Sequence, residues 1–70
     1  MAYDKLLLIL KDVGLSQRKV ADILGISEQS VSQRFHGKVR FKTHEIMKLS
    51  SWLWHHHKVQ VSKVVQAAKD

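Results

Sequence analysis

Residues 28–35 carry amide and hydroxyl side chains whose spacing suits hydrogen bonding to the edges of DNA bases. With about 100° between successive residues of a helix, the apolar residues Val31 and Phe35 define the buried direction. The residues on the opposite side are Gln29, Ser30 and Gln33, and those on the flanks are Glu28, Ser32 and Arg34. Glutamine can form two hydrogen bonds with adenine, and serine can bond several base edges. An ordinary polar surface is the alternative for this helix taken alone.

The residues around this segment predict the elements that position it. Gly25 can take the positive φ that closes a preceding helix, and Ser27 can cap the N-terminus of the next. Apolar residues repeat at helical spacing before the turn: Val20, Ala21 and Leu24. The sequence therefore predicts two helices, over about 17–24 and 27–35, that meet at a tight turn and form a helix-turn-helix.

Three further segments have inward-facing residues at three- and four-residue intervals. They are Tyr3, Leu6, Leu7, Leu10 and Val13; Ile46, Leu49, Ser50 and Leu53; and Val61, Val64, Val65 and Ala68. We expect a first helix that ends at Gly14, a second capped by Ser16, a fourth capped by Thr43, and a short terminal helix, although residues 58–63 alternate as a strand would. With no proline, repeat or linker, residues 1–70 are predicted to form a single all-α domain, a compact four- to five-helix bundle.

The chain is basic, with twelve lysine and arginine residues against six acids and a net charge of +6. No acid lies between Glu28 and Glu45, and several cations follow one another there: Arg34, Lys38, Arg40 and Lys42. A basic domain favours a polyanionic partner, and its lysines and arginines then contact phosphates. A solvated basic loop is the alternative, but its place directly after the predicted helix-turn-helix favours phosphate contact.

Several classes of protein are not supported. The chain has no cysteine, which excludes a disulfide and a thiolate metal site. Its apolar run Leu6–Leu10 is far shorter than the roughly 20 residues that span a bilayer, and it lacks the features of a signal peptide. We therefore expect no membrane association and a location in the cytoplasm of the cell that makes the protein.

Neither catalysis nor a cofactor is expected. The carboxylates are scattered and there is no glycine-rich phosphate loop, so an enzyme is not supported. The run from His55 to His57 does not predict a metal site, because adjacent helical residues point about 100° apart and the usual zinc partners at i+4 are missing.

Residues 17–37 resemble the helix-turn-helix of the lambda repressor and Cro superfamily of phage regulators. The residues that carry this resemblance are Gln17, which opens the second helix, Ala21 in its middle, Gly25 at the turn, and Ile26 and Val31 after it. The stretches YDKL near the start and FKTHEI before the fourth helix are similar to small Cro-like phage proteins. The resemblance implies a lambda-repressor-like DNA-binding domain.

The resemblance, together with the helix phase and the basic loop, implies a set of DNA-contacting residues. They are Gln17, Arg18, Glu28, Gln29, Ser30, Ser32, Gln33, Arg34, His36, Lys38, Arg40 and Lys42. Gln17 corresponds to a position that touches phosphate and braces the recognition helix; Glu28, Gln29 and Gln33 correspond to base-contacting positions. Ser32 corresponds to a position near a thymine methyl or the backbone. His36 and Lys38 correspond to the turn that in the family lies along the sugar–phosphate chain, and Arg40 and Lys42 are further candidates for phosphate contact.

Two of these positions have alternative roles. Glu28 can accept a hydrogen bond from a cytosine amine or hold Arg34 or Gln17 in place. It can also stabilise the positive end of its own helix by its negative charge. Arg34 stands where many relatives have an apolar residue, and Phe35 where many have a polar one, so the hydrophobic anchor has moved by one position.

The sequence-based hypothesis is a Cro-like phage or prophage repressor that binds a double-stranded DNA operator. The alternative is an antirepressor that binds a partner repressor protein through an apolar patch such as Ile23 with Trp54. We expect one of Trp52 and Trp54 to pack in the core. The two tryptophans, together with the stripe Val61, Val64, Val65 and Ala68, can form a homodimer surface. The alternative is that this apolar stripe simply closes the core of the monomer.

Overall fold

Five α-helices and no strand are present in residues 2–69, the part of the chain that the structure, a computed structural model, describes. In chain order they are α1 (Asp4–Asp12), α2 (Gln17–Leu24), α3 (Glu28–Phe35), α4 (Thr43–His57) and α5 (Val61–Ala68). The predicted all-α bundle with a helix-turn-helix is confirmed, including the terminal helix.

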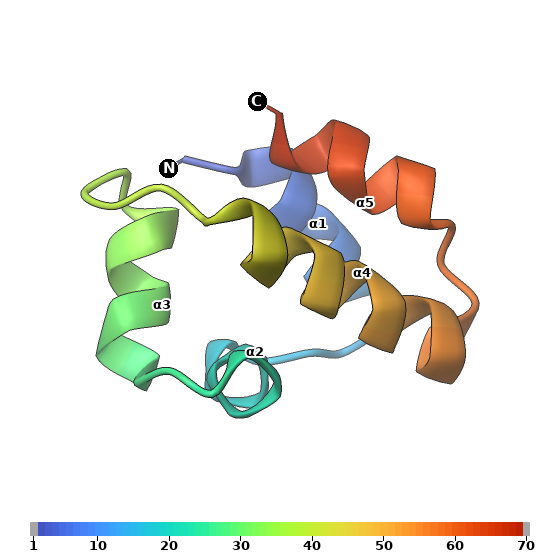
Figure 1. Ribbon diagram of the computed structural model, residues 1–70, viewed down its shortest axis with the longest axis horizontal. Helices are drawn as coiled ribbons and strands as arrows, with labels where there is room; N and C mark the ends of the chain where they lie inside the picture. The colour runs from blue at the N-terminus through green and yellow to red at the C-terminus, as the bar shows by residue number, and fades with distance from the viewer. Residues whose placement is uncertain (1, 70) are drawn as a thin grey trace.

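The long helix α4 runs through the molecule and packs against both α2 and α5 (Figure 1). Helix α1 packs against α5, and α3 stands at one end of the bundle, where it packs against α2 (Figure 1). Helix α3 is therefore held mainly through α2 and leaves one side uncovered.

None of the described helices has the length and apolar composition needed to cross a membrane.

Local hydrogen bonds set the ends of α2 and α3. The Ser16 side chain accepts from the Lys19 backbone N–H at 3.2 Å, and the Ser27 side chain accepts from the Ser30 N–H at 3.0 Å. Gly25 ends α2 with a φ of 70°, in the left-handed region that suits glycine. Both predicted serine caps and the predicted glycine turn are confirmed.

The predicted cap of α4 at Thr43 is wrong by one residue. Thr43 is the first helical residue, and Lys42 occupies the N-cap position. The Lys42 backbone N–H is satisfied by the carboxylate of Glu45 at 2.9 Å. Glu45 therefore supplies the second half of a capping box, in which a carboxylate one turn into the helix accepts from the N-cap backbone N–H.

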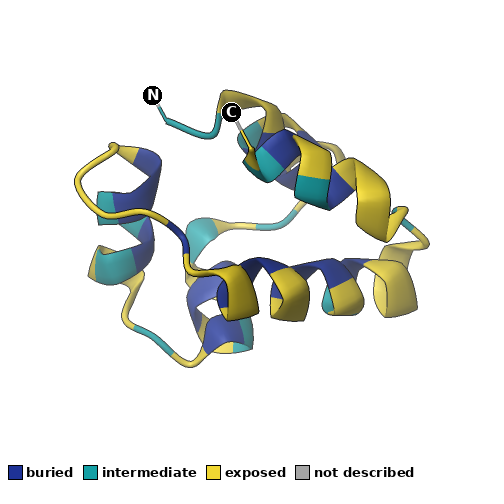
Figure 2. Ribbon diagram, turned by 45° about the horizontal axis from the view of Figure 1, so that its top comes forward, coloured by how far each residue is buried: buried dark blue, intermediate teal, exposed yellow. Residues whose placement is uncertain are grey.

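The core lies where the inner faces of all five helices meet, while their outer faces are exposed (Figure 2). Its buried apolar residues are Leu6, Ile9, Leu10, Val20, Ala21, Leu24, Val31, Phe35, Phe41, Ile46, Leu49, Leu53, Val64 and Ala67. On α5 the buried face is centred on Val64 and Ala67, whereas Val61 is exposed. The expected α5 stripe thus largely closes the monomer core, with its phase shifted from the predicted one.

Candidate nucleic-acid interface

The inner face of α3 is fixed by two apolar side chains. Val31 and Phe35 are both 0% exposed, so they hold the helix against the body of the protein. Gln29 is exposed, whereas Ser30 and Gln33 are half-buried. Val31 and Phe35 thus face the core as predicted, and the amide and hydroxyl residues predicted to lie opposite them are exposed or partly exposed.

Arg34 does not lie on the flank of α3 as the phase of the helix predicted. Its side chain is buried, at 7% exposure, and it forms two hydrogen bonds with Glu45, Nε to Oε1 and Nη2 to Oε2, each 3.0 Å long. Its Nη1 atom donates to the Ser30 carbonyl at 2.9 Å. The expected contact between Arg34 and DNA is therefore corrected: the guanidinium is engaged inside the protein, where it joins α3 to α4.

The partners of the Glu45 carboxylate lower its pKa and so favour its ionised form. Burial raises its pKa, but the hydrogen bonds from Arg34 and the Lys42 backbone, together with the charges of Arg34 and His44, outweigh that effect. The pKa of Glu45 is thus lower than its ordinary value of 4.5. The negative charge of the paired carboxylate also offsets the positive charge of Arg34.

The turn after α3 presents the basic side chains to solvent. Those exposed are His36, Lys38, Arg40 and Lys42. Gly37 has a φ of 79°, and the Lys38 N–H donates to the Gln33 carbonyl at 2.9 Å, so the start of the turn is well defined. The His36 Nδ1 atom lies 2.7 Å from the Ser32 carbonyl. These cations therefore follow directly from the C-terminal end of the exposed α3 face.

An aromatic cluster holds the far end of this turn. The Phe41 ring packs edge-on against Phe35, with centroids 5.3 Å apart, and against Tyr3 at 5.0 Å. The Phe41 N–H also donates to the Tyr3 hydroxyl at 3.1 Å. Residues 36–40 consequently span two anchored points, Phe35 and Phe41.

A family model described as helix-turn-helix matches residues 6–51, which include α2, α3 and the basic turn. The chain belongs to the helix-turn-helix family. This confirms the resemblance to the lambda repressor and Cro superfamily and assigns the chain to DNA-binding regulators. No curated protein and no solved structure matches it.

In the helix-turn-helix, Gln17 and Arg18 begin α2, and Glu28 begins α3. Arg18 and Glu28 are exposed, while Gln17 is half-buried. Glu28 does not hold Arg34, because Glu45 does. The position of Glu28 in the first turn of α3 suits its interaction with the positive end of the helix dipole.

The helix-turn-helix depends on two residues to which the sequence analysis gave no role. Glu45 binds both Arg34 and the Lys42 backbone, and Phe41 anchors the turn. A glutamate one turn after a helix start is the known signature of a capping box, so Glu45 carried a usable signal. Phe41 carried none, because it stands alone among basic residues and has no helical periodicity.

The two tryptophans on α4 differ in their surroundings. Trp52 is half-buried against the core, whereas Trp54 is 38% exposed, with the Lys58 Nζ atom 5.3 Å from its ring centroid. One packed and one exposed tryptophan were expected, and this is confirmed. The expected patch of Ile23 with Trp54 is wrong, because the side chain that lines a groove with Ile23 is Trp52.

The histidine run does not converge. The His56 ring stacks on Trp52 at 4.1 Å between centroids, and its Nδ1 atom lies 3.0 Å from the Trp52 carbonyl. Within residues 2–69 no three histidine, cysteine, aspartate or glutamate side chains are placed to hold a metal ion.

Proposed function

We propose that this chain is a sequence-specific, Cro-like phage or prophage repressor that inserts α3 into the major groove of a DNA operator. One observation carries the proposal: the outer face of α3 is polar and nearly uncharged, and exposed cations follow it directly. Charged contacts position a protein on DNA, whereas amide and hydroxyl contacts to base edges distinguish sequences. The two kinds of side chain are arranged here in adjacent segments.

In this proposal each expected residue has a place. Gln29 and Gln33 contact bases, with Ser30, Ser32 and Glu28 beside them. The phosphate-contacting residues are Gln17, Arg18, His36, Lys38, Arg40 and Lys42. Arg34 is not among the proposed DNA-contacting residues, because it joins α3 to α4 through Glu45 inside the protein. A homodimer belongs to the proposal because paired half-sites are bound by two-fold symmetric proteins.

Selection of bound duplexes from a random pool, followed by electrophoretic mobility shift with the selected sequence, tests this function. We expect a specific complex with the isolated chain and a palindromic selected sequence. If the chain produces no specific shift without a second protein, the repressor proposal fails. The antirepressor alternative, in which a partner repressor protein is bound, then takes its place.

Gln29→Ala and Gln33→Ala are each expected to reduce discrimination at a single base pair by about 1–3 kcal/mol. Their melting temperatures should stay close to that of the unchanged protein, since neither side chain fills the core. Competition binding with single-base operator variants measures the first effect and thermal unfolding the second. Gln66→Ala, an exposed glutamine on α5, is the matched control. A melting decrease without a change in base preference would contradict the assignment.

Lys38→Ala and Arg40→Ala are expected to weaken binding to all sequences alike. Each should make the slope of log K against log salt shallower by about one unit, because one phosphate contact is lost. Titrations at several salt concentrations give the slope, and Lys63→Ala on α5 removes the same charge elsewhere as a control. A slope equal to that of the control would remove the residue from the interface.

A further inference from the structure

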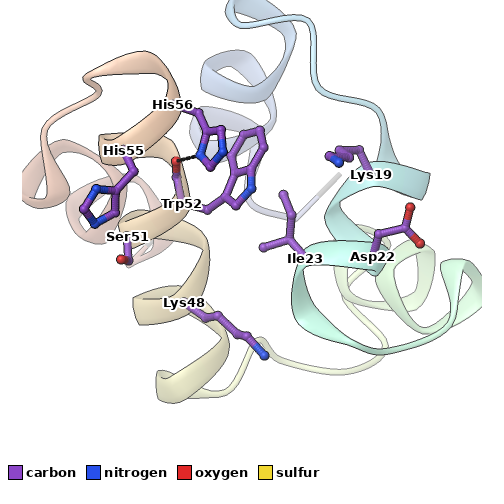
Figure 3. A pocket seen from close by; sticks show the side chains of 8 residues that line it. All are labelled: Lys19, Asp22, Ile23, Lys48, Ser51, Trp52, His55 and His56. Atoms are coloured by element: carbon purple, nitrogen blue, oxygen red, sulfur yellow. Dashed lines mark hydrogen bonds between the residues drawn. The ribbon is translucent and has the colours of Figure 1, made fainter.

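A groove of about 480 Å³ lies between α2 and α4 (Figure 3). Its lining residues come from these two helices and include Lys19, Ile23, Lys48 and Trp52. None of them belongs to α3 or to the turn at 36–42. The groove is therefore separate from the surface proposed to bind DNA.

The floor of the groove is apolar and held in place. Ile23 extends from α2 toward the Trp52 ring on α4 (Figure 3). His56 stacks on the Trp52 ring with only 12° between the planes, and a contact of 3.0 Å from His56 Nδ1 to the Trp52 carbonyl fixes the imidazole. Because this stack supports the indole from one side, its orientation is set before anything binds.

Two lysines and one aspartate are among the residues that line the groove. The Lys19 Nζ atom lies 5.7 Å from the centroid of the Trp52 ring, and Lys48 lines the groove from α4. Asp22 also lines it, but its carboxylate points away from Ile23 and Trp52 (Figure 3). An occupant that combines an apolar side chain with carboxylates would meet complementary groups here.

We propose that the α2–α4 groove docks an acidic segment of a partner protein, which places one apolar side chain between Ile23 and Trp52. Duplex DNA is a poorer occupant, because it would satisfy the lysines but leave the apolar floor unfilled. A second copy of this chain is a poorer occupant of this groove, because its six acidic residues against twelve lysines and arginines offer few carboxylates to the two groove lysines. The partner and DNA bind to different surfaces, so the proposal goes beyond the DNA-binding function.

Two synthetic peptides test the proposal. The first carries a central phenylalanine between glutamates, and the second has lysines in place of the glutamates. Trp54→Phe leaves Trp52 as the remaining tryptophan, so its fluorescence reports on the groove. We expect saturable binding of the acidic peptide and none of the basic one. Failure of the acidic peptide to bind at about 1 mM, the weak end of specific affinity, would overturn the proposal.

Charge reversals locate the binding site. Lys19→Glu combined with Lys48→Glu should weaken peptide binding about tenfold or more, whereas Lys63→Glu on α5, also a charge reversal, should change it much less. All three positions are exposed, so the variants are expected to fold. If Lys63→Glu weakens peptide binding equally, the effect comes from general charge and the proposal is overturned. The proposal is also overturned if duplex DNA, added without peptide, causes the same change in Trp52 fluorescence.

The same double variant separates this proposal from the DNA-binding function. It should still give the specific mobility shift, because the groove contains none of the proposed DNA-contacting residues. Loss of peptide binding with DNA binding retained supports the groove. A concentration-dependent Trp52 signal without peptide would indicate self-association at this surface and contradict an acidic partner.

Discussion

Glu45→Ala is expected to lower the free energy of unfolding by about 3–5 kcal/mol, the cost of leaving a buried charge without its partner. The variant leaves the Arg34 guanidinium at 7% exposure with only the Ser30 carbonyl as a hydrogen-bond acceptor. It also removes the acceptor of the Lys42 N–H. Denaturant unfolding followed by circular dichroism measures the change.

A second variant isolates the charge from the packing. Arg34→Met with Glu45→Leu replaces both ions by apolar side chains, and such replacements are often neutral or stabilising. We expect the double variant to be clearly more stable than Glu45→Ala. If the two are equally unstable, the cost comes from lost packing rather than from the unpaired guanidinium, and the assigned role of the pair is wrong.

The pair should also make stability depend on pH. Because the pKa of Glu45 is lower in the folded state than its ordinary value of 4.5, this carboxylate contributes stability that is fully present above about that value. The contribution is lost as the pH falls through the lowered folded pKa. Glu45→Gln should flatten this part of the acid unfolding curve.

The parts of the fold that the sequence predicts are those set by nearby residues. Ser16, Gly25 and Ser27 act on groups within about one helical turn, so their roles follow from local patterns. The phase of α3 follows in the same way from Val31 and Phe35, which are both buried. Local hydrogen bonding and periodicity therefore suffice for the helix-turn-helix itself.

What the sequence does not predict depends on contacts between distant segments. Arg34 and Glu45 are eleven positions apart, and Phe41 and Tyr3 are thirty-eight apart. The pairing of Ile23 with Trp52 rather than Trp54 is set by the way α2 packs on α4. The phase of a helix predicts the direction of each side chain but not the residue that it contacts. Arg34 is buried because its neighbour on α4, Glu45, has the opposite charge.

Phe35→Ala is expected to cost about 3–5 kcal/mol, as for other buried phenylalanines. The ring is 0% exposed and meets the edges of both Tyr3, at 6.5 Å, and Phe41, at 5.3 Å. Because the aromatic cluster anchors both ends of the turn at 36–40, the loss should affect the basic residues as well as the core. A cost below about 1 kcal/mol in denaturant unfolding, typical of surface substitutions, would mean that Phe35 is not the displaced anchor of α3.

Phe35→Leu keeps most of the apolar volume and provides a folded variant for binding measurements. The leucine still closes the inner face of α3 but loses the edge-on contacts that align Phe41. We expect weaker binding to all DNA sequences with base preference retained, because Gln29 and Gln33 keep their orientation while Lys38 and Arg40 lose theirs. Val31→Ala is the matched core substitution on the same helix, away from the ring cluster. If Val31→Ala weakens general binding as much as Phe35→Leu does at equal stability, the aromatic cluster has no special role in placing the basic turn.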